Sequence, residues 1–176
     1  MDKILDFFIR NPEKEFHVRQ ISKLTRRSPT TVSKYLKEFE KKEILKSEKK
    51  LNHLLFKANT ENTRFKQLKL NYNLNLLNNS GIMNYLIREF NHPEAIILFG
   101  SFSRAEDTSL SDIDLLVINP SKKEIELDEF EKKLSRKIQV FIRSKQDIEK
   151  MKYKNKELLN NWINGIVIYG FWEVFK

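Results

Sequence analysis

Two short groups of residues in the second half of the chain have types and a spacing that suit phosphate and metal chemistry. Gly100 and Ser101 stand together, and ten residues separate Ser101 from the first of two alternating aspartates, Asp112 and Asp114. Alternate side chains of a strand share a face, so these carboxylates are expected about 7 Å apart on one face. Such a pair suits a hard cation such as Mg²⁺. Gly100 permits a tight turn close to a ligand, and Ser101 with the N–H groups of a following helix is suited to hold phosphates.

The elements that must position these residues are predicted from the apolar runs around them. Residues 95–99 form an apolar run of strand length that ends at Gly100, and residues 115–118 extend the aspartate segment as a second run. The predicted order is therefore strand, turn, short helix and strand. A Gly-Ser turn with two surface aspartates is the alternative interpretation, but order, spacing and strand context together favour a functional site.

This pattern of an apolar residue, Gly-Ser, a ten-residue spacer and Asp-apolar-Asp-apolar resembles the nucleotidyltransferase fold of the DNA polymerase β superfamily, especially its minimal nucleotidyltransferase members. The resemblance runs from about residue 95 to residue 170 and includes a late strand over 165–170. It implies transfer of a nucleoside monophosphate from an NTP to an acceptor hydroxyl, with pyrophosphate leaving. By this resemblance Asp112 and Asp114 are catalytic and hold Mg²⁺, and Gly100, Ser101 and Arg104 bind the nucleotide.

In one position the chain departs from the family pattern. The family usually carries a third carboxylate on a later strand, and the matching strand here, residues 137–142, has Gln139 at that position. An amide has no charge and is not a base at neutral pH. Two alternatives follow: Glu106 or Asp107 replaces the missing carboxylate, or the fold binds nucleotide without transferring it. A second departure is Ala105, where small members often carry Gly.

The excess positive charge of the chain lies in its first half. The net charge is +9, and residues 1–80 hold 18 Lys and Arg against 9 Asp and Glu, whereas residues 81–176 hold 15 of each. Such asymmetry favours a polyanion-binding half joined to a half with another task. A generally Lys-rich composition is the alternative explanation.

Residues 1–60 predict three helices followed by a β-hairpin. The third helix is predicted to open with Ser28 as its N-cap and Pro29 as its first residue. This order resembles a winged helix-turn-helix domain, which implies binding to double-stranded DNA or RNA, with protein contact as the alternative. The implied nucleic-acid-binding residues lie before the third helix, on it and on the hairpin: Arg26, Arg27, Thr30, Thr31, Ser33, Lys34, Lys37, Lys49 and Lys50.

A helical connector is predicted over residues 61–92, with Thr60 as the cap of its first helix and a break at Gly81. Its first helix has two apolar stripes, which suit packing between two bodies or against a second chain. The sequence therefore predicts an α+β protein with three parts. These are a winged helix-turn-helix domain at 1–60, the connector at 61–92, and a nucleotidyltransferase domain at 93–176 with a mixed sheet and flanking helices.

Several classes of protein are excluded by composition. The chain has no Cys, which excludes disulfide scaffolds and Cys-based zinc sites, and its three His residues are scattered. No apolar run reaches the length of a membrane span, and the N-terminus does not have the form of a signal peptide, so we expect a soluble cytoplasmic protein without membrane partners.

Two functional hypotheses remain. The first is a Mg²⁺-dependent nucleotidyltransferase with a DNA-binding winged helix. The second is a DNA-binding transcriptional regulator whose transferase-like domain is an inactive nucleotide sensor or a partner-binding module. A homodimer and a separate protein partner fit either hypothesis.

Overall fold

The computed structural model describes residues 3–50, 52–121 and 123–174. The chain forms two compact units, Met1–Tyr72 and Asn73–Lys176. The division falls inside helix α4 (Thr63–Ser80), within the segment 61–92 for which the sequence predicted a connector. Among the described residues, no helix combines the length and the apolar character that crossing a membrane requires.

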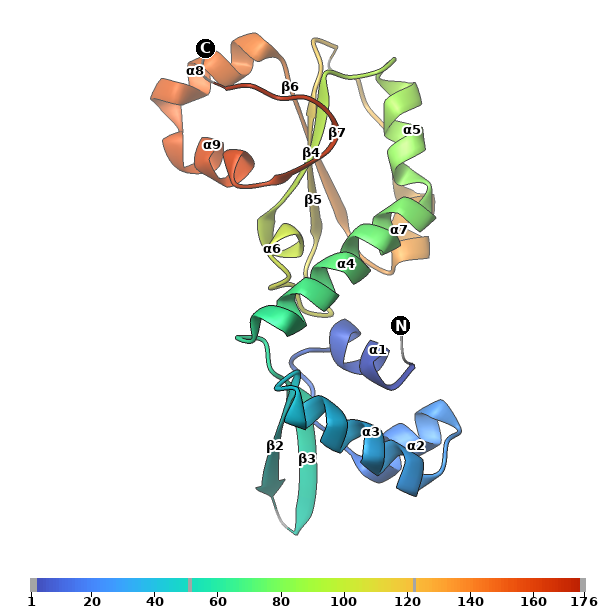
Figure 1. The fold of residues 1–176 in the computed structure, drawn as a ribbon. Coiled ribbons are helices and arrows are strands. Elements are labelled where there is room, and N and C mark those ends of the chain that lie inside the picture. The colour runs from blue at the N-terminus through green and yellow to red at the C-terminus, as the bar shows by residue number, and fades with distance from the viewer. Residues whose placement is uncertain (1–2, 51, 122, 175–176) are drawn as a thin grey trace. The chain divides into compact units, whose positions relative to one another are not determined.

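The first unit contains the three predicted helices and the predicted hairpin (Figure 1). Its elements are α1 (Lys3–Arg10), β1 (Phe16–His17), α2 (Val18–Thr25), α3 (Pro29–Lys41), β2 (Leu45–Lys50) and β3 (His53–Ala58). The strands form an antiparallel sheet in the order β1-β3-β2. The sequence did not predict β1, because two residues are too short to show alternation and only the pairing of Phe16 with Phe56 makes them a strand.

Helix α3 begins as the sequence predicts. The Ser28 hydroxyl accepts a hydrogen bond from the Thr31 N–H at 3.2 Å, and Pro29 occupies the first turn, where it has no N–H to satisfy. Val32 and Leu36 are fully buried in the core of the first unit, together with Phe65 from the start of α4. The opposite face of α3 is therefore left to the solvent.

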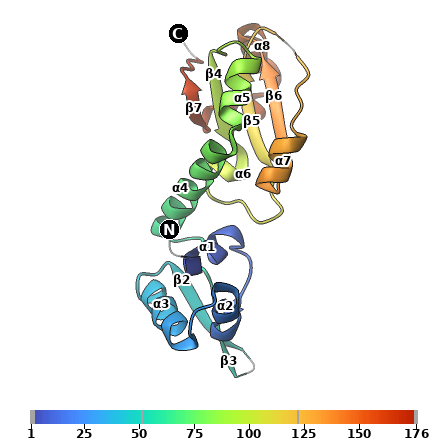
Figure 2. The ribbon, with the colours of Figure 1, turned by 90° about the vertical axis from the view of Figure 1, so that its right-hand side faces the viewer.

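The second unit is built around a four-stranded mixed sheet in the order β6-β5-β4-β7 (Figure 2). Strand β5 runs parallel to β6 and antiparallel to β4, and β7 is antiparallel to β4. Its elements are α5 (Ile82–Glu89), β4 (Ala95–Phe99), α6 (Gly100–Ser103), β5 (Ile113–Ile118), α7 (Asp128–Leu134), β6 (Ile138–Arg143), α8 (Lys145–Lys154), α9 (Lys156–Ile163) and β7 (Ile166–Gly170). The predicted α+β class with a mixed sheet and flanking helices is confirmed for this unit.

Helices cover both faces of this sheet, with α5 and α7 on one side and α8 and α9 on the other (Figure 1). On the first face, Ile113 and Leu115 of β5 pack with Leu86 of α5. On the second face, Leu116 of β5 packs with Trp162 of α9. Successive residues of β5 therefore enter opposite cores, as the period of a strand requires.

The predicted cap of the connector helix is wrong. Helix α4 begins at Thr63, and the Asn62 carboxamide oxygen accepts hydrogen bonds from the N–H groups of Arg64 and Phe65 at 2.9 and 3.2 Å. Thr60 lies in the preceding turn, where the Asn62 N–H bonds to the Asn59 carbonyl at 3.0 Å. The turn delays the start of the helix, so Asn62 caps it.

Candidate functional site

The two aspartates lie at the start of β5, on the sheet face that α8 and α9 cover. Asp114 is on the strand and Asp112 directly precedes it. Asp114 is paired in register with Phe99 on β4 and with Gln139 on β6. Residues paired in register project from the same face of a sheet, so Asp112, Asp114 and Gln139 share one face at the same end of the sheet.

The turn from β4 into α6 places the backbone of Gly100 directly against Asp114. Gly100 has φ of +73°, a conformation that L side chains rarely adopt. A Cβ atom at this position would lie 2.2 Å from Oδ2 of Asp114. The Ser103 hydroxyl closes the turn by donating a hydrogen bond to the Gly100 carbonyl at 2.9 Å. The backbone conformation therefore favours glycine, and a side chain here would also have to displace the Asp114 carboxylate. Partly buried Ser101 follows Gly100.

Gln139 contacts the aspartate pair directly. Its Nε2 donates a hydrogen bond to Oδ2 of Asp112 at 2.8 Å. The register places its backbone beside Asp114, at the position where the sequence analysis expected a third carboxylate. In the part of the chain that the structure describes, no group of three His, Cys, Asp or Glu side chains is placed to hold a metal ion.

Burial and a neighbouring like charge both act on the Asp114 carboxyl. Partial burial raises the pKa of the Asp114 carboxyl, and the negative charge of Asp112 raises it further, whereas the nearby Arg104 guanidinium lowers it. Phe99 lies next to Asp114 and packs edge-on against Phe141, with ring centroids 5.5 Å apart. The carboxylates therefore stand beside an aromatic cluster and repel each other.

The donor set fits one divalent cation whose remaining ligands come from a phosphate or water. Mg²⁺ is commonly held by one or two protein carboxylates together with substrate phosphates. Asp112 and Asp114 supply two carboxylates on one face, and Gln139 supplies an uncharged amide. Asp112 and Asp114 are therefore the carboxylates available here to hold such a cation.

Arg104 and the two acidic residues after it have different environments. The Arg104 Nε forms an ion pair with Oε2 of Glu106 at 2.8 Å, and both side chains are about half exposed. Asp107 is fully buried and accepts hydrogen bonds from Asn73 Nδ2 at 2.8 Å and from Arg136 Nη2 at 3.1 Å. Asp107 is therefore a structural residue, and the suggestion that it replaces the third carboxylate is wrong.

Ala105 lies in the turn between these residues and has φ of 57°. This left-handed conformation is the one that glycine adopts most readily. The left-handed backbone explains why the family resemblance predicts glycine at this position. Ala105 is also buried, so its methyl group is packed rather than exposed.

Arg136 fastens the segment leading to Asp112, and no pattern in the sequence pointed to this residue. Its Nη1 donates to the carbonyl oxygens of Thr108 and Ser111 at 2.6 and 2.8 Å, and its guanidinium lies 5.3 Å from the Phe102 ring centroid. We call Asn73, Asp107 and Arg136 the loop-fastening network. Both residues that donate to Asp107 are at least 29 positions away from it in the sequence. No local sequence pattern therefore reveals the network.

In the first unit, the predicted nucleic-acid-binding residues of α3 differ in their surroundings. Thr30, Lys34 and Lys37 are exposed, and Ser33 is partly buried. The Thr31 hydroxyl lies 2.8 Å from the Ser28 hydroxyl at the helix start. The exposed Lys side chains are therefore the members of this group best placed to contact a polyanion.

The remaining predicted residues flank α3 on either side. Arg26 is exposed and caps α2 in the left-handed conformation, and Arg27 lies over the Tyr35 ring at 5.4 Å. Lys49 is exposed on β2. Lys50 forms ion pairs with Glu15 at 2.8 Å and with Glu48 at 3.2 Å. Lys49 and Lys50 are therefore neighbours in the sequence but have different electrostatic environments.

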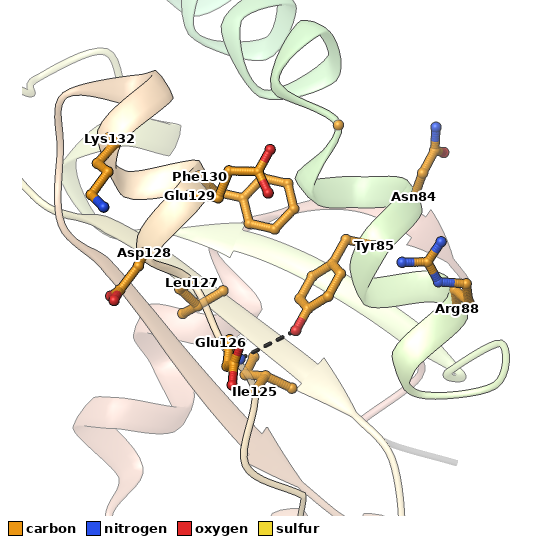
Figure 3. Close-up of a pocket in the computed structure, with 11 residues that line it drawn as sticks. Asn84, Tyr85, Arg88, Ile125, Glu126, Leu127, Asp128, Glu129, Phe130 and Lys132 are labelled. Carbon is orange, nitrogen blue, oxygen red and sulfur yellow. Dashed lines mark hydrogen bonds between the residues drawn. The ribbon is translucent and has the colours of Figure 1, made fainter.

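A hollow of about 970 Å³ lies elsewhere in the second unit, between α5 and the segment around residues 125–132 (Figure 3). The Tyr85 hydroxyl accepts a hydrogen bond from the Glu126 N–H at 3.2 Å. The charged residues that line the hollow are Arg88, Lys132 and three acidic residues. It includes no residue of the aspartate site, and its mixed charges favour no single class of ligand.

Comparison with known protein families gives a match over residues 80–171 to the family described as "Polymerase beta, Nucleotidyltransferase". The matched segment is more than half of the 176-residue chain and includes Gly100, Asp112 and Asp114. No curated protein shows significant similarity to the chain.

Proposed function

Because the chain belongs to the polymerase β nucleotidyltransferase family, we propose that its second unit binds an NTP with Mg²⁺ and transfers a nucleoside monophosphate to an acceptor hydroxyl. The observation that carries this proposal is the close approach of Asp114 to the Gly100 backbone, with Asp112 on the same face. It joins a turn suited to phosphates to a pair of carboxylates suited to Mg²⁺.

Each residue of the site has a proposed task. Asp112 and Asp114 hold the cation, while Gly100 and Ser101 bind the β- and γ-phosphates through backbone N–H and hydroxyl groups. The half-exposed Arg104 adds positive charge near the phosphates through its remaining guanidinium N–H groups, while its Nε stays paired with Glu106. Mg²⁺, when bound, neutralises charge on the phosphates and on the leaving pyrophosphate. The acceptor oxygen bonds to the α-phosphorus and loses its proton to water. The bond between the α-phosphorus and the oxygen that bridges it to the β-phosphorus breaks, and pyrophosphate leaves.

The test is transfer of label from each α-labelled NTP in the presence of Mg²⁺. The protein itself, duplex DNA and mixed RNA are offered as acceptors. We expect the wild type to transfer label and the Asp112→Asn/Asp114→Asn variant to lose transfer. The control is Asp128→Asn/Glu129→Gln, which removes the same two charges from exposed positions on α7. Equal activity of the two double variants would contradict the assignment of the site.

A second candidate function is a nucleotide sensor without turnover. The hydrogen bond from Gln139 to Asp112 favours it, because an amide neither adds charge to a metal site nor accepts a proton from an attacking hydroxyl. In this case labelled NTP is retained on a filter with Mg²⁺ and no label moves to any acceptor. Loss of retention in Asp112→Asn/Asp114→Asn would assign the sensor to the same site.

For the first unit, we propose a winged helix-turn-helix domain that binds double-stranded DNA. Support comes from the order α1-β1-α2-α3-β2-β3, from the exposed Lys34 and Lys37 on α3, and from the excess positive charge of residues 1–80. Binding would bring the nucleotide chemistry to DNA or regulate it. We expect Lys34→Ala to weaken binding across sequences and to reduce its salt dependence. Lys156→Ala, which removes an exposed charge from α9, is the matched control.

A further inference from the structure

Gln139 occupies the position on β6 that lies beside the aspartate pair. The register sets its backbone beside Asp114, and its Nε2 donates to Oδ2 of Asp112 at 2.8 Å. The amide N–H therefore satisfies an Asp112 oxygen that would otherwise be available to a cation. A metal ion that uses this oxygen must first displace the hydrogen bond.

The neighbouring acidic residues do not supply a third negative ligand. Glu106 is paired with Arg104, and Asp107 is fully buried in the loop-fastening network. In the described part of the chain no three carboxylate or imidazole groups converge on a metal position. Among the residues that the structure describes, only Asp112 and Asp114 offer negative charge to a cation at this site.

Cation affinity in oxygen-ligand sites rises with the number of anionic ligands. Two carboxylates, one of them already hydrogen-bonded, hold a hydrated divalent cation weakly. The phosphates of a nucleotide add the oxygen ligands that the protein lacks. Metal and nucleotide are therefore expected to bind together, each raising the affinity of the other.

We propose that Gln139 restricts the site to one divalent cation, which enters with the nucleotide, and that its amide takes the place of a second cation beside Asp112. This inference rests on the proposed nucleotide site. It makes Gln139 a residue that determines the metal requirement, in addition to any effect on turnover.

The test counts Mn²⁺ ions by electron paramagnetic resonance and calorimetry, first with Mn²⁺ alone and then with Mn²⁺ and an ATP analogue that cannot be cleaved between its α- and β-phosphates. For the wild type we expect weak binding of Mn²⁺ alone and one tightly bound Mn²⁺ per chain with the analogue. Two Mn²⁺ ions per wild-type chain under either condition would overturn the inference.

Two variants at this exposed position separate charge from shape. Gln139→Glu keeps the side-chain length, adds a third negative charge and removes the donor. We expect it to tighten binding of Mn²⁺ alone by about tenfold or more. Gln139→Leu frees the Asp112 oxygen without adding charge, so we expect Mn²⁺ alone to bind more tightly, but by less than about threefold. An unchanged affinity for Mn²⁺ in Gln139→Glu would refute the inference.

A stability measurement gives an independent readout. In chelator, Gln139→Glu places a third carboxylate beside Asp112 and Asp114, so its thermal midpoint should fall below that of the wild type, and Mn²⁺ should restore it. Adding Asp112→Asn should remove most of this metal response. These stability measurements need no nucleotide, so they test the inference independently of nucleotide binding. Failure of the wild type to bind the ATP analogue would contradict the proposed function instead.

Discussion

The loop-fastening network predicts a large loss of stability when its buried carboxylate is neutralised. In Asp107→Asn the side chain keeps its size, but the Arg136 guanidinium, whose side chain is 10% exposed, loses its counter-charge. Breaking a buried ion pair by removing one partner costs about 3–5 kcal/mol. Arg136 keeps its bonds to two backbone carbonyls and its contact with the Phe102 ring, so we expect about 3 kcal/mol, at the lower end of this range.

The assay is urea unfolding followed by tryptophan fluorescence. Both Trp162 and Trp172 belong to the second unit, so the signal reports the stability of this unit. The matched control is Arg104→Gln/Glu106→Gln, which removes a half-exposed ion pair of the same segment. Surface pairs of this kind contribute less than about 1 kcal/mol, so the control should unfold close to the wild type.

A double-mutant cycle with Arg136→Met tests the reasoning directly. If the loss in Asp107→Asn comes from an uncompensated guanidinium, removing that guanidinium as well should recover part of the stability, with a coupling energy of about 1–3 kcal/mol. A loss below about 1 kcal/mol in Asp107→Asn, or additive effects in the double variant, would refute the assigned role of the network.

Three further predictions concern single residues. Gly100→Ala should weaken Mg²⁺-nucleotide binding more than tenfold in a filter assay, because its Cβ would lie 2.2 Å from Asp114 Oδ2 at φ of +73°. Asp114→Asn should stabilise the second unit near neutral pH. Because the pKa of Asp114 is raised in the folded state, the folded protein keeps this proton to a higher pH than the unfolded chain does. Wild-type stability therefore falls as the pH rises from the ordinary Asp pKa through the raised one. The urea midpoints of the wild type and Asp114→Asn should converge at a pH below the ordinary pKa. Lys49→Ala should weaken DNA binding and its salt slope more than Lys50→Ala in a titration, because Lys50 is already paired with Glu15 and Glu48; an equal loss in both variants would contradict this reason.

Local sequence determined most of the elements and the spacing of the candidate site. The strands β4 and β5 follow from apolar runs, and the start of α3 follows from Ser28 and Pro29, because burial pattern and capping act over a few residues. Asp112 and Asp114 lie on one face because side chains along a strand alternate with a period of two residues. The position of Gln139 on the later strand was also identified from the pattern, and the register places it beside Asp114.

Tertiary structure decided which groups those residues meet. Asp107 and Glu106 are alike in sequence, yet Asp107 is buried against Asn73 and Arg136 while Glu106 faces Arg104 at the surface. The bond from Gln139 to Asp112 joins residues 27 positions apart. Such contacts depend on strand register and helix packing, which sum many weak interactions along the whole unit, and no window of neighbouring residues contains them. The sequence by itself therefore determined most of the elements and the candidate ligands. Only the fold decided which carboxylates are partly exposed at the candidate site and which are buried to hold it in place.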